Sequence, residues 1–172
     1  MEKFDLIILG SGPGGYVTAI RASQLGLKTA IVEKESLGGV CLNWGCIPTK
    51  ALLKSAQVFD YIKHSEDYGI TVENFDKNFD NVINRSRKVA QNMSKGVNFL
   101  MKKNKIKIFE GFGQLVPDKI IKISDKNGSE TKIEGDKIII ATGARSKELP
   151  FLKKDGKKII GYREAMTLEK QP

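Results

Sequence analysis

The only two cysteines of the chain, Cys41 and Cys46, lie in one short segment with four residues between them. Two thiols at this spacing can close a small disulfide loop and can therefore gain or lose two electrons. Reactive cysteines occur in electropositive surroundings. Lys50 follows Cys46 by four residues, and Pro48 predicts that a helix begins close to Cys46. Because the start of a helix favours a thiolate, the residues favour a redox-active pair.

Two other interpretations of the cysteine pair have less support. A zinc site takes about four ligands, and the single histidine, His64, is isolated in a predicted helix. A structural disulfide is uncommon in a reducing compartment. We expect a soluble, cytoplasmic protein without metal. Residues 1–3 lead into an apolar stretch without the layout of a signal peptide, and no apolar run has the roughly 20 residues that cross a bilayer.

A glycine-rich turn precedes the cysteine segment. Residues 10–15 fit G-x-G-x-x-G and lie between a predicted strand over 4–9 and a predicted helix over 16–25. In this motif the glycines allow a tight turn, a close approach to pyrophosphate and close packing of the helix. Glu33 ends a second predicted strand over 28–32, where an acid can bind an adenosine ribose and would repel the 2′-phosphate of NADP. The unit predicts a dinucleotide site that holds FAD or NAD.

The remaining pattern predicts an α/β domain. Helices are expected over 48–63 and 80–103, with a polar loop between them at 65–78. Further strands are expected over 106–109, 112–116, 119–124, 131–133 and 137–141. The tail after residue 147 is less regular. We expect a Rossmann-like domain with a central parallel sheet, helices packed on it and a small antiparallel β-meander insertion.

The chain carries a net charge of +9 among its 172 residues. A basic balance can indicate nucleic-acid binding when the positive residues cluster. Here the lysines are dispersed along the chain, and the densest runs, 102–105 and 153–158, are short. We therefore expect no nucleic-acid partner and no membrane partner.

The segment from Gly38 to Leu53 resembles the redox segment of the pyridine nucleotide–disulfide oxidoreductases. It is most similar to the members that oxidise dihydrolipoamide, because Leu42 and the run from Ile47 to Leu53 match that version. The glycine turn and residues 138–144 match the FAD domain of the family in the same order. Members that reduce glutathione disulfide or mercuric ion share the C-x4-C segment and remain alternatives, as does a standalone flavin-binding module.

The resemblance implies an FAD-binding domain over 1–150, with the redox segment at 38–50, and a connector over 151–172. It implies that Cys46 is the thiol nearer the flavin, that Cys41 exchanges with dihydrolipoamide and that Lys50 approaches the flavin ring. These three residues are the expected catalytic residues. The expected cofactor-binding residues are Gly10, Gly12, Pro13, Gly14, Gly15, Glu33, Lys34, Gly38, Gly39, Val40, Cys41, Gly45, Cys46, Lys50, Gly113, Ala141, Thr142 and Gly143.

The resemblance also implies partners and parts beyond these residues. Family members bind NAD⁺ as co-substrate on a second domain and take a catalytic histidine from the partner subunit of a homodimer. Their substrate is carried on a lipoyl domain of a 2-oxo acid dehydrogenase complex. No second G-x-G-x-x-G occurs in the chain, and His64 matches no catalytic base of the family. We therefore expect residues 1–172 to be a fragment that does not turn over by itself.

Overall fold

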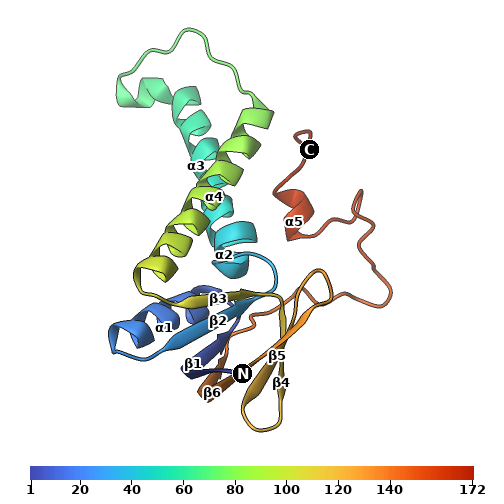
Figure 1. The fold of residues 1–172 in the computed structure, drawn as a ribbon. Coiled ribbons are helices and arrows are strands. Elements are labelled where there is room, and N and C mark those ends of the chain that lie inside the picture. The colour runs from blue at the N-terminus through green and yellow to red at the C-terminus, as the bar shows by residue number, and fades with distance from the viewer.

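The computed structural model describes residues 1–172 as a mixed α/β fold, which confirms the predicted class. A sheet lies at one end of the molecule, and two long helices rise from it side by side (Figure 1). The elements in chain order are β1 (Glu2–Leu9), α1 (Pro13–Gln24), β2 (Thr29–Glu33), α2 (Gly39–Trp44), α3 (Cys46–Lys63), the 3₁₀ helix η1 (Ser65–Tyr68), α4 (Phe79–Lys103), β3 (Lys107–Glu110), β4 (Phe112–Val116), β5 (Ile120–Ser124), β6 (Glu130–Ile140) and α5 (Tyr162–Ala165).

The six strands form one sheet in the order β3-β2-β1-β6-β5-β4. Strands β3, β2, β1 and β6 run parallel, whereas β6, β5 and β4 form an antiparallel meander. We predicted two strands at 131–133 and 137–141, but β6 runs without a break. It pairs with β5 through its first residues and with β1 through its later ones, so the meander extends the main sheet.

Strand β1 is apolar on both faces because each face is covered. Leu6 and Ile8 belong to a core cluster that includes residues of α1 and α4. Ile7 and Leu9 belong to a second cluster with side chains of β5 and β6. Successive side chains of a strand point to opposite faces. The continuous apolar run of β1 therefore fits the buried centre of a sheet between a helical layer and the meander.

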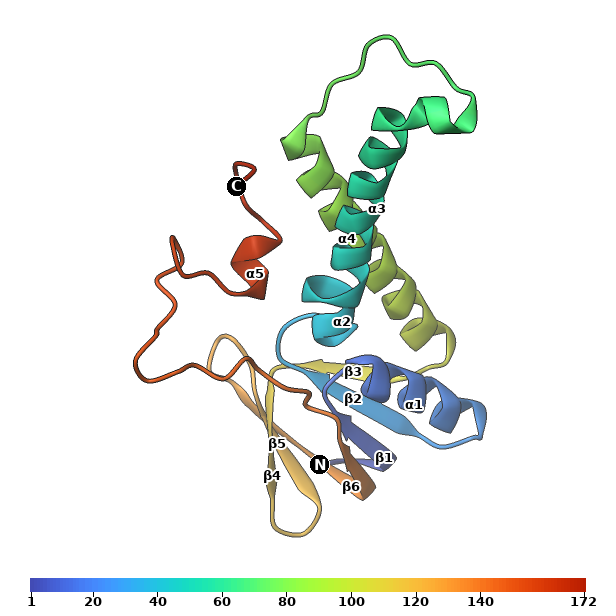
Figure 2. The ribbon, with the colours of Figure 1, turned by 180° about the vertical axis from the view of Figure 1, so that it is seen from behind.

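Helices α3 and α4 form an antiparallel pair that extends away from the sheet (Figures 1 and 2). Asn78 caps the start of α4, since its Oδ1 accepts a hydrogen bond of 2.9 Å from the backbone N–H of Asn81. Arg85 of α4 donates to the carbonyl of Ala51 in α3 at 2.7 Å. The lower ends of both helices lie beside α2 and so support the segment that carries the cysteines.

The chain after β6 returns to the same region. It leaves the sheet, follows an extended path and places α5 beside the α2–α3 end of the helical pair (Figure 2). We expected residues 151–172 to be a connector, and α5 within them contacts the cysteine segment through Arg163. None of the helices combines the length and the apolar character required to cross a membrane.

Candidate active site

The glycine turn brings the end of β1 against the end of β6. Gly10 has φ +93°, a left-handed conformation that favours glycine. A Cβ at Gly10 would lie 2.4 Å from the carbonyl oxygen of Ala141. On the other side of the turn, the N–H of Gly10 donates to Val32 at 2.8 Å. Strands β2 and β6 are the two neighbours of β1, and the turn is held between them at the carboxyl edge of the parallel strands.

The start of α1 is open toward a ligand. Gly12 is the N-cap residue, and it supplies no side-chain hydrogen bond to the first turn, which also contains no acidic residue. A Cβ at Gly12 or Gly14 would meet no atom within 4 Å. Unpaired amides and the dipole at a helix start attract anions. These residues therefore fit the pyrophosphate of a dinucleotide.

Glu33 is held at the end of β2 by three hydrogen bonds. Its Oε2 accepts from the N–H and the hydroxyl of Ser11 at 2.9 and 2.6 Å, and its Oε1 accepts from the N–H of Glu35 at 2.8 Å. A carboxylate has about four lone-pair sites, so Glu33 can still accept a bond from a ribose hydroxyl. We did not single out Ser11, although a serine between the first two glycines of the motif was visible in the sequence.

A groove of about 670 Å³ lies over this edge of the sheet. Its walls come from the glycine turn, the loop after β2, helix α2, the segment after β6 and helix α5. The expected site residues that line it are Gly10, Gly12, Pro13, Glu33, Lys34, Gly39, Val40, Cys41, Ala141, Thr142 and Gly143. The groove therefore joins the predicted dinucleotide site to one of the two cysteines.

Other expected site residues lie outside the lining of the groove. They are Gly14, Gly15, Gly38, Gly45, Cys46, Lys50 and Gly113. Packing explains why residue 113 is a glycine. A Cβ there would lie 2.7 Å from Leu9 Cδ2 and 3.0 Å from Val32 Cγ1. The glycine therefore lets β4 pack on β1 and β2. A backbone contact of Gly113 with adenine stays a prediction.

The cysteine segment contains one more helix than we predicted. Cys41 lies in α2, and Cys46 is the first residue of α3, which begins two residues before the predicted start at Pro48. Gly45 separates the helices, and a Cβ there would lie 3.0 Å from the carbonyl oxygen of Val40. Glycine is thus required for the tight junction. Both thiols are free; Cys41 is half-buried and Cys46 is exposed.

The Cys41 thiol is less acidic than an ordinary cysteine. Burial raises the pKa of the Cys41 thiol above its ordinary value, and a hydrogen bond and charge interaction with Cys46 raise it further. A backbone interaction at Cys46 and the positive charge of Lys50 act in the opposite direction without cancelling the shift. The mutual effect indicates that the two side chains interact. Cys41 therefore keeps its proton to a higher pH than an ordinary cysteine does.

We expect the two cysteines to react with iodoacetamide at different rates in the chain without cofactor. At pH 7.5 the exposed Cys46 should be alkylated faster than the half-buried Cys41, because burial limits access to the Cys41 sulfur and raises the pKa of its thiol. The rate at Cys41 should still be rising at pH 9, the ordinary pKa from which this thiol is raised. Peptide mapping by mass spectrometry measures both rates. Equal rates at pH 7.5 would contradict the asymmetry.

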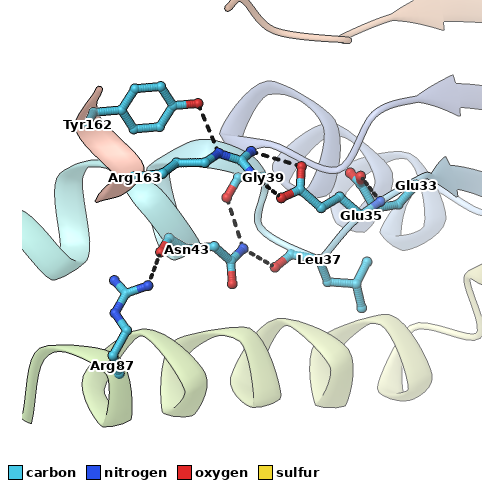
Figure 3. A network of polar contacts seen from close by, with 8 residues as sticks. All are labelled: Glu33, Glu35, Leu37, Gly39, Asn43, Arg87, Tyr162 and Arg163. Carbon is cyan, nitrogen blue, oxygen red and sulfur yellow. Dashed lines mark hydrogen bonds and ion pairs between the residues drawn. The ribbon is translucent and has the colours of Figure 1, made fainter. Parts of the chain in front are cut away.

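A polar network holds α2 in place (Figure 3). The side-chain amide of Asn43 donates to the carbonyls of Leu37 and Gly39 at 3.0 and 2.9 Å. The hydroxyl of Ser94 in α4 lies 3.0 Å from the same Leu37 carbonyl, and Arg87 of α4 donates to the carbonyl of Asn43 at 2.9 Å. Our sequence reasoning missed Asn43, Ser94 and Arg87, because nothing local indicates that α4 lies against α2.

A second part of the network connects α5 with the loop after β2 (Figure 3). Arg163 donates to both carboxylate oxygens of Glu35 at 2.5 and 2.9 Å. Such a bidentate pair fixes geometry as well as charge. The hydrogen bond from Arg163 is the largest cause that lowers the pKa of Glu35 below its ordinary value, and Trp44 and Lys34 also lower it. Sequence reasoning missed Glu35 and Arg163 as well.

Comparisons with known proteins agree with this arrangement. The family model described as pyridine nucleotide-disulphide oxidoreductase matches residues 4–172. The chain is 48% identical to the dihydrolipoyl dehydrogenase of Zymomonas mobilis over 171 residues, which are 99% of this chain and 37% of that protein. It is 50% identical to the dihydrolipoyl dehydrogenase of Rhizobium etli over 186 residues, 99% of this chain and 39% of that protein.

The fold has a counterpart among solved structures. The crystal structure of LpdA from Mycobacterium tuberculosis superposes with a TM-score of 0.88 at 22% identity, and the match covers 99% of this chain and 38% of that one. The chain thus spans less than two fifths of the length of the relatives that it matches. With the family model covering nearly all of its residues, the chain belongs to the pyridine nucleotide–disulphide oxidoreductase family.

Proposed function

We propose that this chain binds FAD and carries the redox-active disulfide of an enzyme that oxidises dihydrolipoamide to lipoamide, with NAD⁺ as the electron acceptor. One observation carries the proposal: Cys41, one member of a close dithiol, lines the same groove as the glycine turn of a dinucleotide site. The names of relatives that are 48–50% identical supply the substrate class.

The chain's own residues fit FAD. The uncapped start of α1 at Gly12 would hold the pyrophosphate, and Glu33 would accept a hydrogen bond from the adenosine ribose. Space over Gly12 and Gly14 leaves room for the phosphates. Lys50 would place a positive charge near the dithiol, where it already opposes the rise in the pKa of Cys41. When bound, FAD would accept the electron pair of the dithiol and deliver it to NAD⁺.

The thiol chemistry balances without a further reactant. The two thiols of dihydrolipoamide attack the Cys41–Cys46 disulfide through a mixed disulfide. Two electrons and two protons pass to the chain, which becomes the dithiol, and the substrate leaves as the cyclic disulfide. In the proposal Cys41 accepts the mixed disulfide and Cys46 faces the flavin. A homodimer, a lipoyl-domain partner and a cytoplasmic location belong to the same proposal.

Flavin protection of the cysteines tests the proposed site. FAD bound in the groove should slow alkylation of both cysteines at least about tenfold, because a covered thiolate is inaccessible: Cys41 lines the groove, and the proposal places Cys46 facing the flavin. Gly12→Glu, which places a negative charge at the start of α1, should abolish this protection. A matched Gly14→Ala variant separates loss of space from loss of charge complementarity. Protection of neither cysteine at saturating FAD would contradict the site.

A substrate comparison tests the activity. The full-length protein should form NADH from dihydrolipoamide and NAD⁺, as the names of its relatives indicate, and should be inactive with oxidised glutathione and NADPH. Cys41→Ser and Cys46→Ser should each abolish turnover, since each removes half of the disulfide. Turnover with glutathione disulfide in place of dihydrolipoamide would instead support another reductase of the family.

A further inference from the structure

Trp44, the single tryptophan of the chain, lies between the two cysteines and contacts two guanidinium groups. The guanidinium carbon of Arg87, from α4, is 4.8 Å from the ring centroid, and that of Arg163, from α5, is 5.0 Å from it. Cations within about 6 Å of an indole face are attracted to it, most strongly when water is excluded. We call this group of Trp44, Arg87 and Arg163 the tryptophan clamp.

Arg87 has few partners other than the ring. Its Nη1 donates to the carbonyl of Asn43 at 2.9 Å, but Nε and Nη2 are buried and have no hydrogen-bond acceptor. No carboxylate forms an ion pair with it, and burial lowers the pKa of Arg87. A partly buried charge without a carboxylate partner is costly to a fold. Two groups at the end of α2 offset this cost: the aromatic face of Trp44 and the carbonyl of Asn43. The position of Arg87 is therefore linked to the position of α2.

Arg163 approaches the same ring from another part of the chain. Its fork binds Glu35, and the interactions with Glu35 and with the Tyr162 hydroxyl raise its pKa. Trp44 also contributes to lowering the pKa of Glu35. Arg163 therefore contacts both Trp44 and Glu35. The ring is therefore approached by Arg87 from α4 and by Arg163 from α5.

The clamp acts on a weak element. Helix α2 has only six residues, and such a short helix depends on tertiary contacts for its position. Cys41 lies in α2 and Cys46 follows it after Gly45, so the distance between the two sulfur atoms depends on where the end of α2 lies. Trp44 is the last residue of α2. Holding its ring fixes the backbone between the cysteines.

We propose that Arg87 and Arg163 are positioning residues for the dithiol, because they hold Trp44 and so keep Cys41 and Cys46 at a separation that favours the disulfide. This inference rests on the proposed redox function and adds two residues to it. Preorganisation raises the effective concentration of one thiol toward the other. Loss of the clamp should therefore shift the equilibrium toward the dithiol.

A glutathione equilibrium measures this effect in the chain of 172 residues. One oxidised glutathione takes two electrons and two protons from the dithiol and yields two reduced glutathiones and the Cys41–Cys46 disulfide. Arg87→Met should lower the equilibrium constant for disulfide formation about tenfold, a change of about 30 mV in the midpoint potential for two electrons. Arg163→Met should lower it in the same direction. The disulfide is quantified by acid quenching, alkylation and intact mass.

Arg85→Met is the matched control. Arg85 is also an arginine of α4 that donates to a backbone carbonyl, but its acceptors are Ala51 at 2.7 Å and the Ser55 hydroxyl at 3.3 Å, both in α3. Its removal should cost stability without moving the equilibrium constant more than about twofold, because Arg85 contacts neither Trp44 nor the backbone between the two cysteines. A merely structural role of Arg87 predicts equal constants for the Arg85 and Arg87 variants, and that result would overturn the inference.

Fluorescence gives a second readout that is specific to the clamp. Trp44 is the only indole, so its emission anisotropy should fall and its acrylamide quenching should rise in Arg87→Met but not in Arg85→Met. If Arg87→Met does not fold, Arg87→Lys keeps the charge without the planar fork and should show both changes to a smaller extent. Failure of the wild-type chain to form the disulfide would reject the proposed function. If the wild-type chain forms the disulfide and the Arg87 variants have the same equilibrium constant, the role of the tryptophan clamp is rejected and the proposed function is not.

Discussion

Replacing Gly15 with alanine should destabilise the chain more than any other single change in the glycine turn. A Cβ at this position would lie 1.9 Å from the carbonyl oxygen of Gly10 and 2.9 Å from its carbon, both backbone atoms of the turn. Neither atom can move without breaking the junction of β1, β2 and β6. We expect a loss of at least about 3 kcal/mol in the free energy of unfolding, because overpacking against backbone cannot relax by a rotamer change.

Gly14→Ala is the control for this prediction. Gly14 is the preceding residue of α1, and a Cβ there meets nothing within 4 Å. Alanine is favoured over glycine inside a helix by about 1 kcal/mol, so Gly14→Ala should be neutral or stabilising in the chain without cofactor. Urea unfolding followed by circular dichroism gives both values. Similar destabilisation by the two variants would show that helix propensity, and not contact with Gly10, governs this turn.

The second large effect is expected at Glu33. Its carboxylate is the acceptor for the N–H and the hydroxyl of Ser11, whose side chain is fully buried, and for the N–H of Glu35. Glu33→Ala leaves these donors without their acceptor. Since an unsatisfied buried donor costs about 1–3 kcal/mol and more when the lost partner is charged, we expect a loss of about 3 kcal/mol. FAD binding should weaken as well, because the turn at Ser11 loses its support.

Two further variants interpret the Glu33 result. Glu33→Gln keeps one acceptor oxygen of similar shape and should recover part of the lost stability. Glu130→Ala removes an exposed carboxylate that pairs with Lys122 on the sheet surface, and surface pairs contribute about 1 kcal/mol or less. Thermal melts at one pH compare all three variants. A Glu33→Ala cost as small as that of Glu130→Ala would mean that water replaces the lost acceptor at Ser11.

The first βαβ unit could be predicted from the sequence because its signals are local. The apolar run ending at Leu9, the glycines from Gly10 to Gly15 and the helical pattern that follows are all within one window. The structure begins α1 at Pro13, three residues before the predicted start, because the glycine turn itself leads into the first helical turn. Proline fits that position since its missing N–H is not needed there.

The errors concern elements that tertiary contacts decide. Helix α2 is too short to show a helical period, and its position depends on α4. Strand β6 was divided in two because Gly135 and Asp136 interrupt the apolar pattern, yet the backbone continues through them to pair with β1. A Cβ at Gly135 would lie 2.8 Å from Ile7 Cδ1. Glycine is therefore needed here for close packing on β1. The local sequence pattern alone suggests a turn at this position.

The candidate site divides in the same way. The cysteine pair, the glycine turn and Glu33 were identified because each is a compact motif with known chemistry. Arg87, Glu35 and Arg163 contribute through partners that lie 44 or 128 residues away in the sequence. A single sequence contains no signal for such pairs. The sequence therefore predicts a chemistry for the groove at Cys41, but not the side chains that hold the groove in place.

The position of β6 in the sheet has a consequence for how the protein assembles. β6 is inserted beside β1, and Glu2 at the start of the chain pairs opposite Ile133. Contacts between residues so distant in the sequence form slowly, because a long loop must close before they contribute. During synthesis, the free edge of β1 stays open until residue 140 has left the ribosome. An unpaired apolar strand edge is a template for association with other chains. This protein should therefore depend on chaperones, or on early flavin binding at the neighbouring turn, until β6 has been made.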